Sequence, residues 1–193
     1  MVAAVYNPAW YEQEYFCTYP YVGGYQDYAR HGAVVDRVLD MLRPSSVLDV
    51  GCAYGYVVRR LLHLAVPAMG CDVSRWCEQQ AAKVIPSHFV RTNAWQLAMF
   101  RDKEFDLLFC EGVLEHIPED KVEQLMREFG RVAQRRLLAL SYNKPEVLGD
   151  TGVLHHLTNH DVNWWIERVP AHTYLGYTGR SVDIETLWVY KDA

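Results

Sequence analysis

Short apolar runs alternate along the chain with longer segments in which apolar residues recur at helical spacing. The apolar runs predict seven strands, at residues 46–50, 68–72, 88–91, 105–110, 136–142, 172–177 and 184–191. The helical spacing predicts five helices, at residues 28–42, 56–64, 74–84, 117–132 and 160–169. Strands that alternate with helices in this way form an α/β fold, in which helices cover both faces of a mainly parallel sheet. The turn residues at 178–181 predict that the last strand is antiparallel.

The composition is that of a single acidic domain. The 193 residues carry 19 basic and 24 acidic side chains, a formal net charge of −5, and half of the chain is hydrophobic. We expect one domain, with an N-terminal segment and helix at 1–43, a ligand-binding core at 44–145 and an acceptor-side part at 146–193. The basic residues are scattered, which argues against a nucleic-acid partner.

Neither a membrane span nor a secretion signal is predicted. No apolar run reaches the roughly 18 residues that a span requires, and the first residues lack a basic segment followed by an apolar one. We therefore expect a cytoplasmic protein with no membrane partner. The five cysteines include no C-x-x-C pair, so a disulfide framework or zinc knuckle is not expected either.

A glycine-containing loop follows the first predicted strand. Residues 49–55 read Asp-Val-Gly-Cys-Ala-Tyr-Gly and lead into a helix, whose N-terminus adds partial positive charge near the loop's backbone N–H groups. Asp72 ends the second strand, where a carboxylate can accept hydrogen bonds from two ribose hydroxyls. The two features together predict an adenosine-type ligand. The dinucleotide pattern G-x-G-x-x-G fails at Ala53 and Tyr56, which disfavours an NAD-dependent oxidoreductase.

The loop resembles the D-x-G-x-G-x-G motif of class I S-adenosylmethionine-dependent methyltransferases, with Ala53 in place of the middle glycine. The resemblance continues at residues 70–74 (GCDVS), at Asn93-Ala94 and at residues 114–117 (LEHI), and it covers about residues 30–145. Within this class, the sequence is similar to the small-molecule methyltransferases of the ubiquinone-biosynthesis-like type. The resemblance implies a Rossmann-like class I fold and S-adenosylmethionine as cofactor.

Residue roles follow from the resemblance one position at a time. Asp49 is expected to hold the amino group of the cofactor, Asp72 its ribose hydroxyls, and Asn93 its adenine. Asn93 stands where the family often has aspartate, but an amide oxygen can also accept a hydrogen bond from the adenine amine. The expected cofactor contacts are Asp49, Gly51, Cys52, Ala53, Gly55, Asp72, Val73, Trp76, Asn93, Ala94, Cys110 and Glu111.

The acceptor is expected beyond the carboxyl ends of the strands, where open α/β sheets bind their ligands. Candidate residues at these ends are Glu111, Glu115, His116, Tyr142 and Asn143. His116 is a candidate catalytic base, and its alternative is a histidine with only a structural role at a helix start.

Three histidines lie close together after the fifth strand. His155 and His156 are candidates for a catalytic loop, because a histidine can take up a proton near neutral pH. Two alternatives remain open: solvated loop histidines, or a metal site in which His156 and His160 act with Asp150 or Asp161. The favoured interpretation has no metal.

The first 28 residues hold seven of the thirteen tyrosines. In similar methyltransferases the segment before the first strand often folds over the cofactor, so Tyr15, Tyr21, Tyr25 and Tyr28 are candidate lid residues. The alternative is a strap whose rings cover apolar surface. Of Trp164 and Trp165 we expect one in the core, and Trp165 is the candidate for the acceptor pocket.

The leading hypothesis is an S-adenosylmethionine-dependent methyltransferase that acts on oxygen or nitrogen of a small molecule. The alternative is a non-catalytic protein, or partner subunit, that binds S-adenosylmethionine or its demethylated product. After the fourth strand the chain reads Cys-Glu-Gly-Val, without the Asn/Asp-Pro-Pro-Tyr motif of DNA amino-methylation. The acceptor and the oligomeric state are not predicted.

Overall fold

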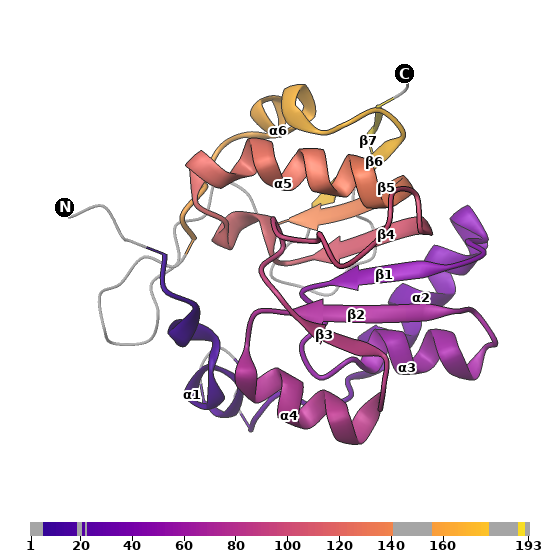
Figure 1. Cartoon of the computed structure of the whole chain (residues 1–193), viewed down its shortest axis with the longest axis vertical. Helices are drawn as coiled ribbons and strands as arrows, with labels where there is room; N and C mark the ends of the chain where they lie inside the picture. The colour runs from indigo at the N-terminus through magenta and orange to yellow at the C-terminus, as the bar shows by residue number, and fades with distance from the viewer. Residues whose placement is uncertain (1–5, 19–20, 22, 141–155, 178–188, 192–193) are drawn as a thin grey trace.

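The computed structural model describes residues 6–18, 21, 23–140, 156–177 and 189–191 (Figure 1). A seven-stranded sheet forms the centre, in the order β3-β2-β1-β4-β5-β6-β7. The strands are β1 (Val47–Val50), β2 (Ala68–Asp72), β3 (Phe89–Arg91), β4 (Phe105–Glu111), β5 (Ala133–Leu140), β6 (Thr173–Tyr177) and β7 (Val189–Lys191). Six strands are parallel, and β7 pairs antiparallel with β6. The predicted Rossmann-like α/β fold with an antiparallel last strand is confirmed.

Helices cover both faces of the sheet. They are α2 (Ala29–Leu42), α3 (Tyr56–His63), α4 (Arg75–Val84), α5 (Glu119–Val132) and α6 (Val162–Arg168). The leader adds a 3₁₀ turn, η1 (Pro8–Tyr11), and a short helix, α1 (Gln13–Cys17), while a second 3₁₀ turn, η2 (Leu114–His116), precedes α5. The first helix group, α2 to α4, packs on one face of the sheet, and α5 and α6 pack on the other.

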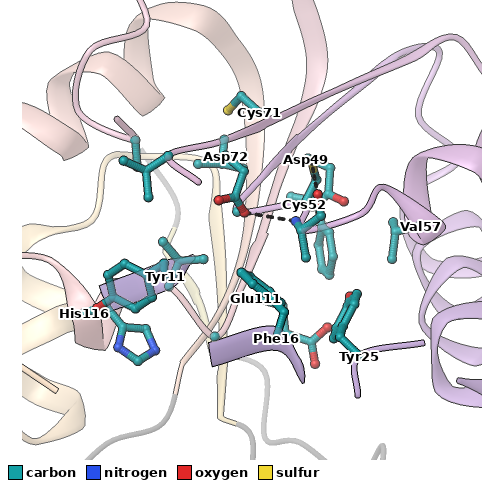
Figure 2. A pocket seen from close by; sticks show the side chains of 18 of the residues that line it. Tyr11, Phe16, Tyr25, Asp49, Cys52, Val57, Cys71, Asp72, Glu111 and His116 are labelled. Carbon is teal, nitrogen blue, oxygen red and sulfur yellow. Dashed lines mark hydrogen bonds between the residues drawn. The ribbon is translucent and has the colours of Figure 1, made fainter. Parts of the chain in front are cut away.

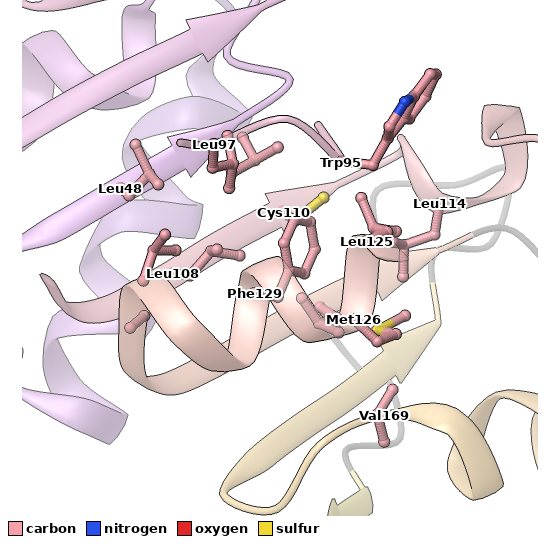
Figure 3. Packing of buried hydrophobic residues seen from close by; sticks show 14 of the residues in the cluster. Leu48, Trp95, Leu97, Leu108, Cys110, Leu114, Leu125, Met126, Phe129 and Val169 are labelled. Atoms are coloured by element: carbon pink, nitrogen blue, oxygen red, sulfur yellow. The ribbon is translucent and has the colours of Figure 1, made fainter. Parts of the chain in front are cut away.

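Alternate residues of the central strands supply the two cores. In β4, Leu107 and Phe109 face the α2–α4 side, whereas Leu108 and Cys110 face the α5 side. Figure 3 shows the second cluster, where Phe129 of α5 packs over Leu108 and its neighbours. Both faces of a parallel strand are buried, which explains why these strands are continuous apolar runs in the sequence.

Two of the boundary differences from the predictions have a clear physical reason. Helix α5 begins at Glu119 rather than residue 117, because Pro118 is its N-cap and the residue before a proline favours extended backbone. Strand β5 begins three residues earlier than predicted, at Ala133. Its early positions are charged, but Arg135 pairs with Asp106 at 2.8 Å and Arg136 donates to the Ala133 carbonyl, so polar side chains are satisfied within the sheet.

The sheet topology decides where a ligand fits. Strands β1 to β3 are added outward to one side of the sheet, and strands β4 to β7 are added outward to the other side. The order of the strands therefore reverses between the parallel neighbours β1 and β4. A crevice outside the carboxyl ends of the strands forms at such a switch point. The loops after β1, β2 and β4 meet there. No helix in the described part of the chain is long and apolar enough to cross a membrane.

Candidate functional site

The glycine loop after β1 has a backbone that ordinary residues rarely adopt. Gly51 and Gly55 have φ angles of +80° and +83°, in the left-handed region that favours glycine. A Cβ atom on Gly51 would lie 2.1 Å from Cγ2 of Val113, and one on Gly55 would lie 2.3 Å from Cδ1 of Ile85. The N–H groups of Gly51 and Cys52 both donate to the Cys71 carbonyl, at 2.8 and 3.1 Å. The loop is therefore held tightly against β2 and β4.

The Asp72 carboxylate is fixed at the end of β2 by backbone donors. Ala53 N–H donates to one of its oxygens at 3.0 Å (Figure 2). Ser74 N–H donates to the other oxygen, also at 3.0 Å. Ser74 in turn accepts from Cys77 N–H and caps α4. Burial raises the pKa of Asp72, although the hydrogen bonds from Ser74, Ala53 and Val73 oppose that shift. Each carboxylate oxygen keeps acceptor capacity for a ligand hydroxyl.

A pocket lies between these strand ends and the N-terminal leader, with about 990 Å³ of empty space including its open side. Three carboxylates line it, from the buried Asp49 and the half-buried Asp72 and Glu111. Arg30 is the one lysine or arginine in the described lining. Burial raises the pKa of Asp49, and repulsion from Glu111 and Asp72 raises it further. Burial also raises the pKa of Glu111, against the opposing effect of Arg30. The excess of acid favours a cationic ligand.

The leader forms the outer wall of the pocket. Glu12 between η1 and α1 accepts hydrogen bonds from the N–H groups of Arg75 and Trp76, both at 2.9 Å, at the N-terminus of α4. The Tyr6 hydroxyl donates to the side-chain oxygen of Asn93 at 3.3 Å. These contacts hold the leader over the carboxyl edge of the sheet, beside α4 in Figure 1. Of the candidate lid tyrosines, three line the pocket: Tyr15, Tyr21 and Tyr25.

Two histidines meet at one end of the pocket. His116 lines the pocket and makes an edge contact with the ring of Tyr11, at a centroid distance of 5.5 Å (Figure 2). It makes another with the ring of His156, at 4.8 Å. Thr158 holds the His156 segment against η2, because its N–H donates to the Glu115 carbonyl at 3.1 Å and its hydroxyl to the Ile117 carbonyl at 2.6 Å.

Within the described residues, His156 and His160 are not grouped as possible metal ligands. His160 instead contacts the Glu119 carboxylate at 3.0 Å and stacks on Trp164 at 4.1 Å between ring centroids. A different group of possible ligands comes together, from Glu115, His116 and His156, with their ligand atoms all within 4.8 Å of one another.

Eight of the twelve expected cofactor contacts line the pocket, namely Asp49, Gly51, Cys52, Ala53, Asp72, Val73, Ala94 and Glu111. The other four lie outside the described lining. Gly55 fits the loop against Ile85, and the Trp76 indole donates to the Tyr54 hydroxyl at 2.8 Å. Asn93 binds Tyr6 and Gln96, and Cys110 is fully buried in the core because its neighbour Glu111 takes the pocket face of β4.

Several residues predicted for the acceptor side lie outside the pocket lining. Trp165 was expected to face the acceptor pocket, but it is fully buried in the core between α5 and the sheet, because its position on α6 faces inward. Tyr28 points to a separate cleft, where its hydroxyl donates to the Gly24 carbonyl at 2.9 Å. Glu115 is buried beside His116 rather than in the lining. His155, Tyr142 and Asn143 lie outside the described residues.

Several lining residues are not among the predicted site residues, including Tyr6, Tyr11, Arg30 and Trp95. A signal existed for Tyr11, which precedes Tyr15 by one helical turn and so could share its face. Arg30 had none, because nothing local indicates that the first turn of α2 meets the carboxyl edge of the sheet.

Comparisons with known proteins agree with this geometry. A family model described as a methyltransferase domain matches residues 47–136. The chain is similar to the solved structure of the PH0226 protein from Pyrococcus horikoshii OT3, with 23% sequence identity and a TM-score of 0.52, over 63% of this chain and 61% of that chain. It also matches a SAM-dependent methyltransferase from Archaeoglobus fulgidus, with 17% identity and a TM-score of 0.46, over 54% of this chain and 49% of that chain. No curated protein matches the sequence. The chain thus spans less than two thirds of either solved structure.

Proposed function

We propose that the chain is a class I methyltransferase that uses S-adenosylmethionine and catalyses methyl transfer to an oxygen or nitrogen atom of a small molecule. The match of residues 47–136 to a methyltransferase-domain model supports this proposal. The observation that carries the proposal is the pocket at the switch point, where the glycine loop, the fixed Asp72 carboxylate and an excess of acid converge. We place this activity in the cytoplasm and assign it no nucleic-acid or membrane partner.

Charge complementarity supports the orientation of the cofactor. We assign its ammonium group to Asp49, its ribose hydroxyls to Asp72 and its carboxylate to Arg30, the cation in the described lining. Val73 and Ala94 lie beyond Asp72 and offer an apolar surface for the adenine. The tyrosine rings of the leader cover the same space and exclude water. Burial raises the pKa of Tyr6 and Tyr21 to about 12, so these hydroxyls keep their protons at neutral pH.

The cofactor supplies an activated methyl group, whose carbon forms a bond to the acceptor atom while the carbon–sulfur bond breaks and its electron pair passes to sulfur. The chain's own contribution is alignment of the acceptor, exclusion of water and removal of the acceptor's proton. We place the acceptor at the end of the pocket formed by Tyr11, His116 and Ile117, opposite the ribose site. The histidine pair there promotes loss of the proton, a contribution typically worth about 10² to 10⁴ in rate.

The test combines binding and turnover. Titration calorimetry with S-adenosylmethionine and with S-adenosylhomocysteine measures cofactor binding, and a radiolabelled methyl-transfer screen over phenols, alcohols and amines measures activity. Binding of both ligands with label transferred to a small molecule supports the proposal. Binding without transfer to any acceptor class favours the non-catalytic alternative, and absence of binding rejects both.

Replacement of Asp72 gives the first residue-level prediction. Asp72→Ala is expected to weaken S-adenosylmethionine binding by about 1.5–3 kcal/mol, the usual range for hydrogen bonds to a charged group. Calorimetry of the folded variant checks this, with Asp36→Ala as control because Asp36 is exposed and forms only a surface pair with Arg60. Equal affinities for the two variants would remove Asp72 from the site.

A further inference from the structure

We propose that Glu115, His116 and His156 bind one divalent cation of the zinc type at the acceptor end of the pocket. The role of this cation rests on the proposed function: its open coordination position takes the acceptor's oxygen or nitrogen. The cation site itself depends only on the three side chains.

The fold brings the three ligands together from two distant segments. Glu115 and His116 belong to η2, directly after β4, whereas His156 lies forty residues later. The two Thr158 hydrogen bonds, to the carbonyls of Glu115 and Ile117, fix these segments side by side. The juxtaposition is therefore built into the backbone rather than into mobile surface side chains.

The donor set suits a borderline-soft cation with an open position. Two imidazole nitrogens and one carboxylate oxygen are a ligand set of catalytic zinc sites, which leave the fourth position to water or substrate. With bonds of about 2.0–2.1 Å, tetrahedral ligand atoms lie about 3.4 Å apart. The observed ligand atoms lie within 4.8 Å of one another, so modest side-chain rotations close the site.

Burial favours coordination at this position. The side chains of Glu115 and His156 are only 3% and 7% exposed, so the carboxylate is shielded from bulk water. Buried charges in proteins are normally paired or coordinate metals. A divalent cation here would also offset the acid excess of the adjoining pocket, which includes Asp49, Asp72 and Glu111.

A second, independent observation indicates a ligand at this end. The Tyr11 hydroxyl is buried and has no hydrogen-bond partner in the described part of the chain, although Tyr11 is 8% exposed and lines the pocket. Its ring lies edge-on to His116 at 5.5 Å between ring centroids (Figure 2). The hydroxyl can donate to an acceptor bound at the cation.

The cation would act on the acceptor as a Lewis acid. Coordination lowers the pKa of a bound O–H or N–H group, as it does for zinc-bound water. The proton passes to water, and the cation-bound lone pair becomes the nucleophile for the methyl carbon. In this arrangement His116 and His156 promote loss of the acceptor's proton indirectly, because they hold the cation that lowers the acceptor's pKa.

The experiment uses the full chain, stripped with a chelator and dialysed. Titration calorimetry with Zn²⁺ alone is expected to show one strong site per chain. Glu115→Gln, His116→Ala and His156→Ala are each expected to weaken Zn²⁺ binding by at least about 100-fold, since even outer-shell partners of metal ligands are worth 10–100-fold. His160→Ala is the matched control, because His160 is the nearby histidine that binds Glu119 instead. It is expected to leave Zn²⁺ affinity unchanged.

Measurements on the parent chain cover the case in which a variant fails to fold. The Co²⁺-loaded chain is expected to give contact-shifted proton resonances from two coordinated imidazoles, and isotope-labelled His116 and His156 identify them. Absence of stoichiometric Zn²⁺ binding, resonances from other histidines, or an equal loss in His160→Ala would overturn the proposal.

S-Adenosylhomocysteine titration of the cation-free chain separates the two proposals. Binding of S-adenosylhomocysteine without any Zn²⁺ site overturns the cation site and leaves the methyltransferase proposal standing. A Zn²⁺ site without cofactor binding supports the cation site and rejects the proposed function.

Discussion

Asp49→Asn is expected to weaken S-adenosylmethionine binding by about 3–5 kcal/mol, roughly 150- to 5,000-fold, while making the ligand-free protein more stable. Asp49 is 4% exposed on β1 and faces Glu111 and Asp72 across the pocket. In the complex its carboxylate is the proposed partner of a buried ammonium group, and removing one partner of a buried ion pair typically costs that much. Calorimetry and thermal unfolding of the same samples measure the two effects.

The increase in stability follows from the direction of the pKa shift. Burial and neighbouring carboxylates raise the pKa of Asp49 above its unfolded value. Between these two values the folded state holds a proton that the unfolded state has lost, so the ligand-free protein becomes less stable as pH rises through that window. Cofactor affinity changes in the opposite direction, since only the ionised carboxylate pairs with the ammonium. Both pH dependences should flatten in Asp49→Asn.

Asp106→Asn is the matched control, with the opposite sign. Asp106 lies at the start of β4, away from the pocket, and although burial works against it, hydrogen bonds from Arg135 and Ser45 hold the pKa of its carboxyl below the usual range. This variant should lose stability and keep its cofactor affinity. If Asp49→Asn behaves like Asp106→Asn in both measurements, Asp49 is a structural carboxylate.

Gly51→Val is expected to abolish detectable cofactor binding. At φ +80° a β-branched residue is strained by about 1–2 kcal/mol, and its Cβ would lie 2.1 Å from Cγ2 of Val113. Relief of this collision moves the loop or Val113, and both line the pocket. We expect a lower melting temperature with a native circular dichroism spectrum, and no heat of S-adenosylmethionine binding.

Gly23→Val separates backbone strain from displacement of the pocket wall. Gly23 has a φ of +85°, but a Cβ there has no atom within 4 Å, and the residue does not line the pocket. It should lose only the stability that backbone strain costs, about 1–2 kcal/mol, and still bind the cofactor. The double variant Gly51→Ala with Val113→Ala lacks Cγ2 of Val113, the atom with which the new Cβ collides. It is expected to bind the cofactor better than Gly51→Ala alone. Normal binding by folded Gly51→Val would show that the loop has been assigned wrongly.

The seven strands, the five longer helices and the glycine loop after β1 could be predicted from the sequence alone. Buried parallel strands are short apolar runs, and helices carry their apolar residues at helical spacing, so both are local signals. The positive φ of Gly51 and the place of Asp72 at a strand end could be anticipated, because each depends on residues next to it in the chain. Their cofactor roles stay predictions. The boundary error at Pro118 is local as well, because it arises from a proline. The one at Ala133 is not, because it depends on the pairing of Arg135 on β5 with Asp106 on the neighbouring strand β4.

Contacts between distant segments were decided only by the tertiary structure. Neither Arg30 at the pocket nor the meeting of His116 with His156 has a sequence signal, since each depends on which segments the sheet order places side by side. Trp165 is a further example. The helical pattern predicted that one of the two tryptophans is buried, but only the packing of α6 showed that Trp165 is the buried one. Local patterns determine elements and turns, whereas the acid excess of the pocket and the histidine cluster arise where loops far apart in the chain converge on one edge of the sheet.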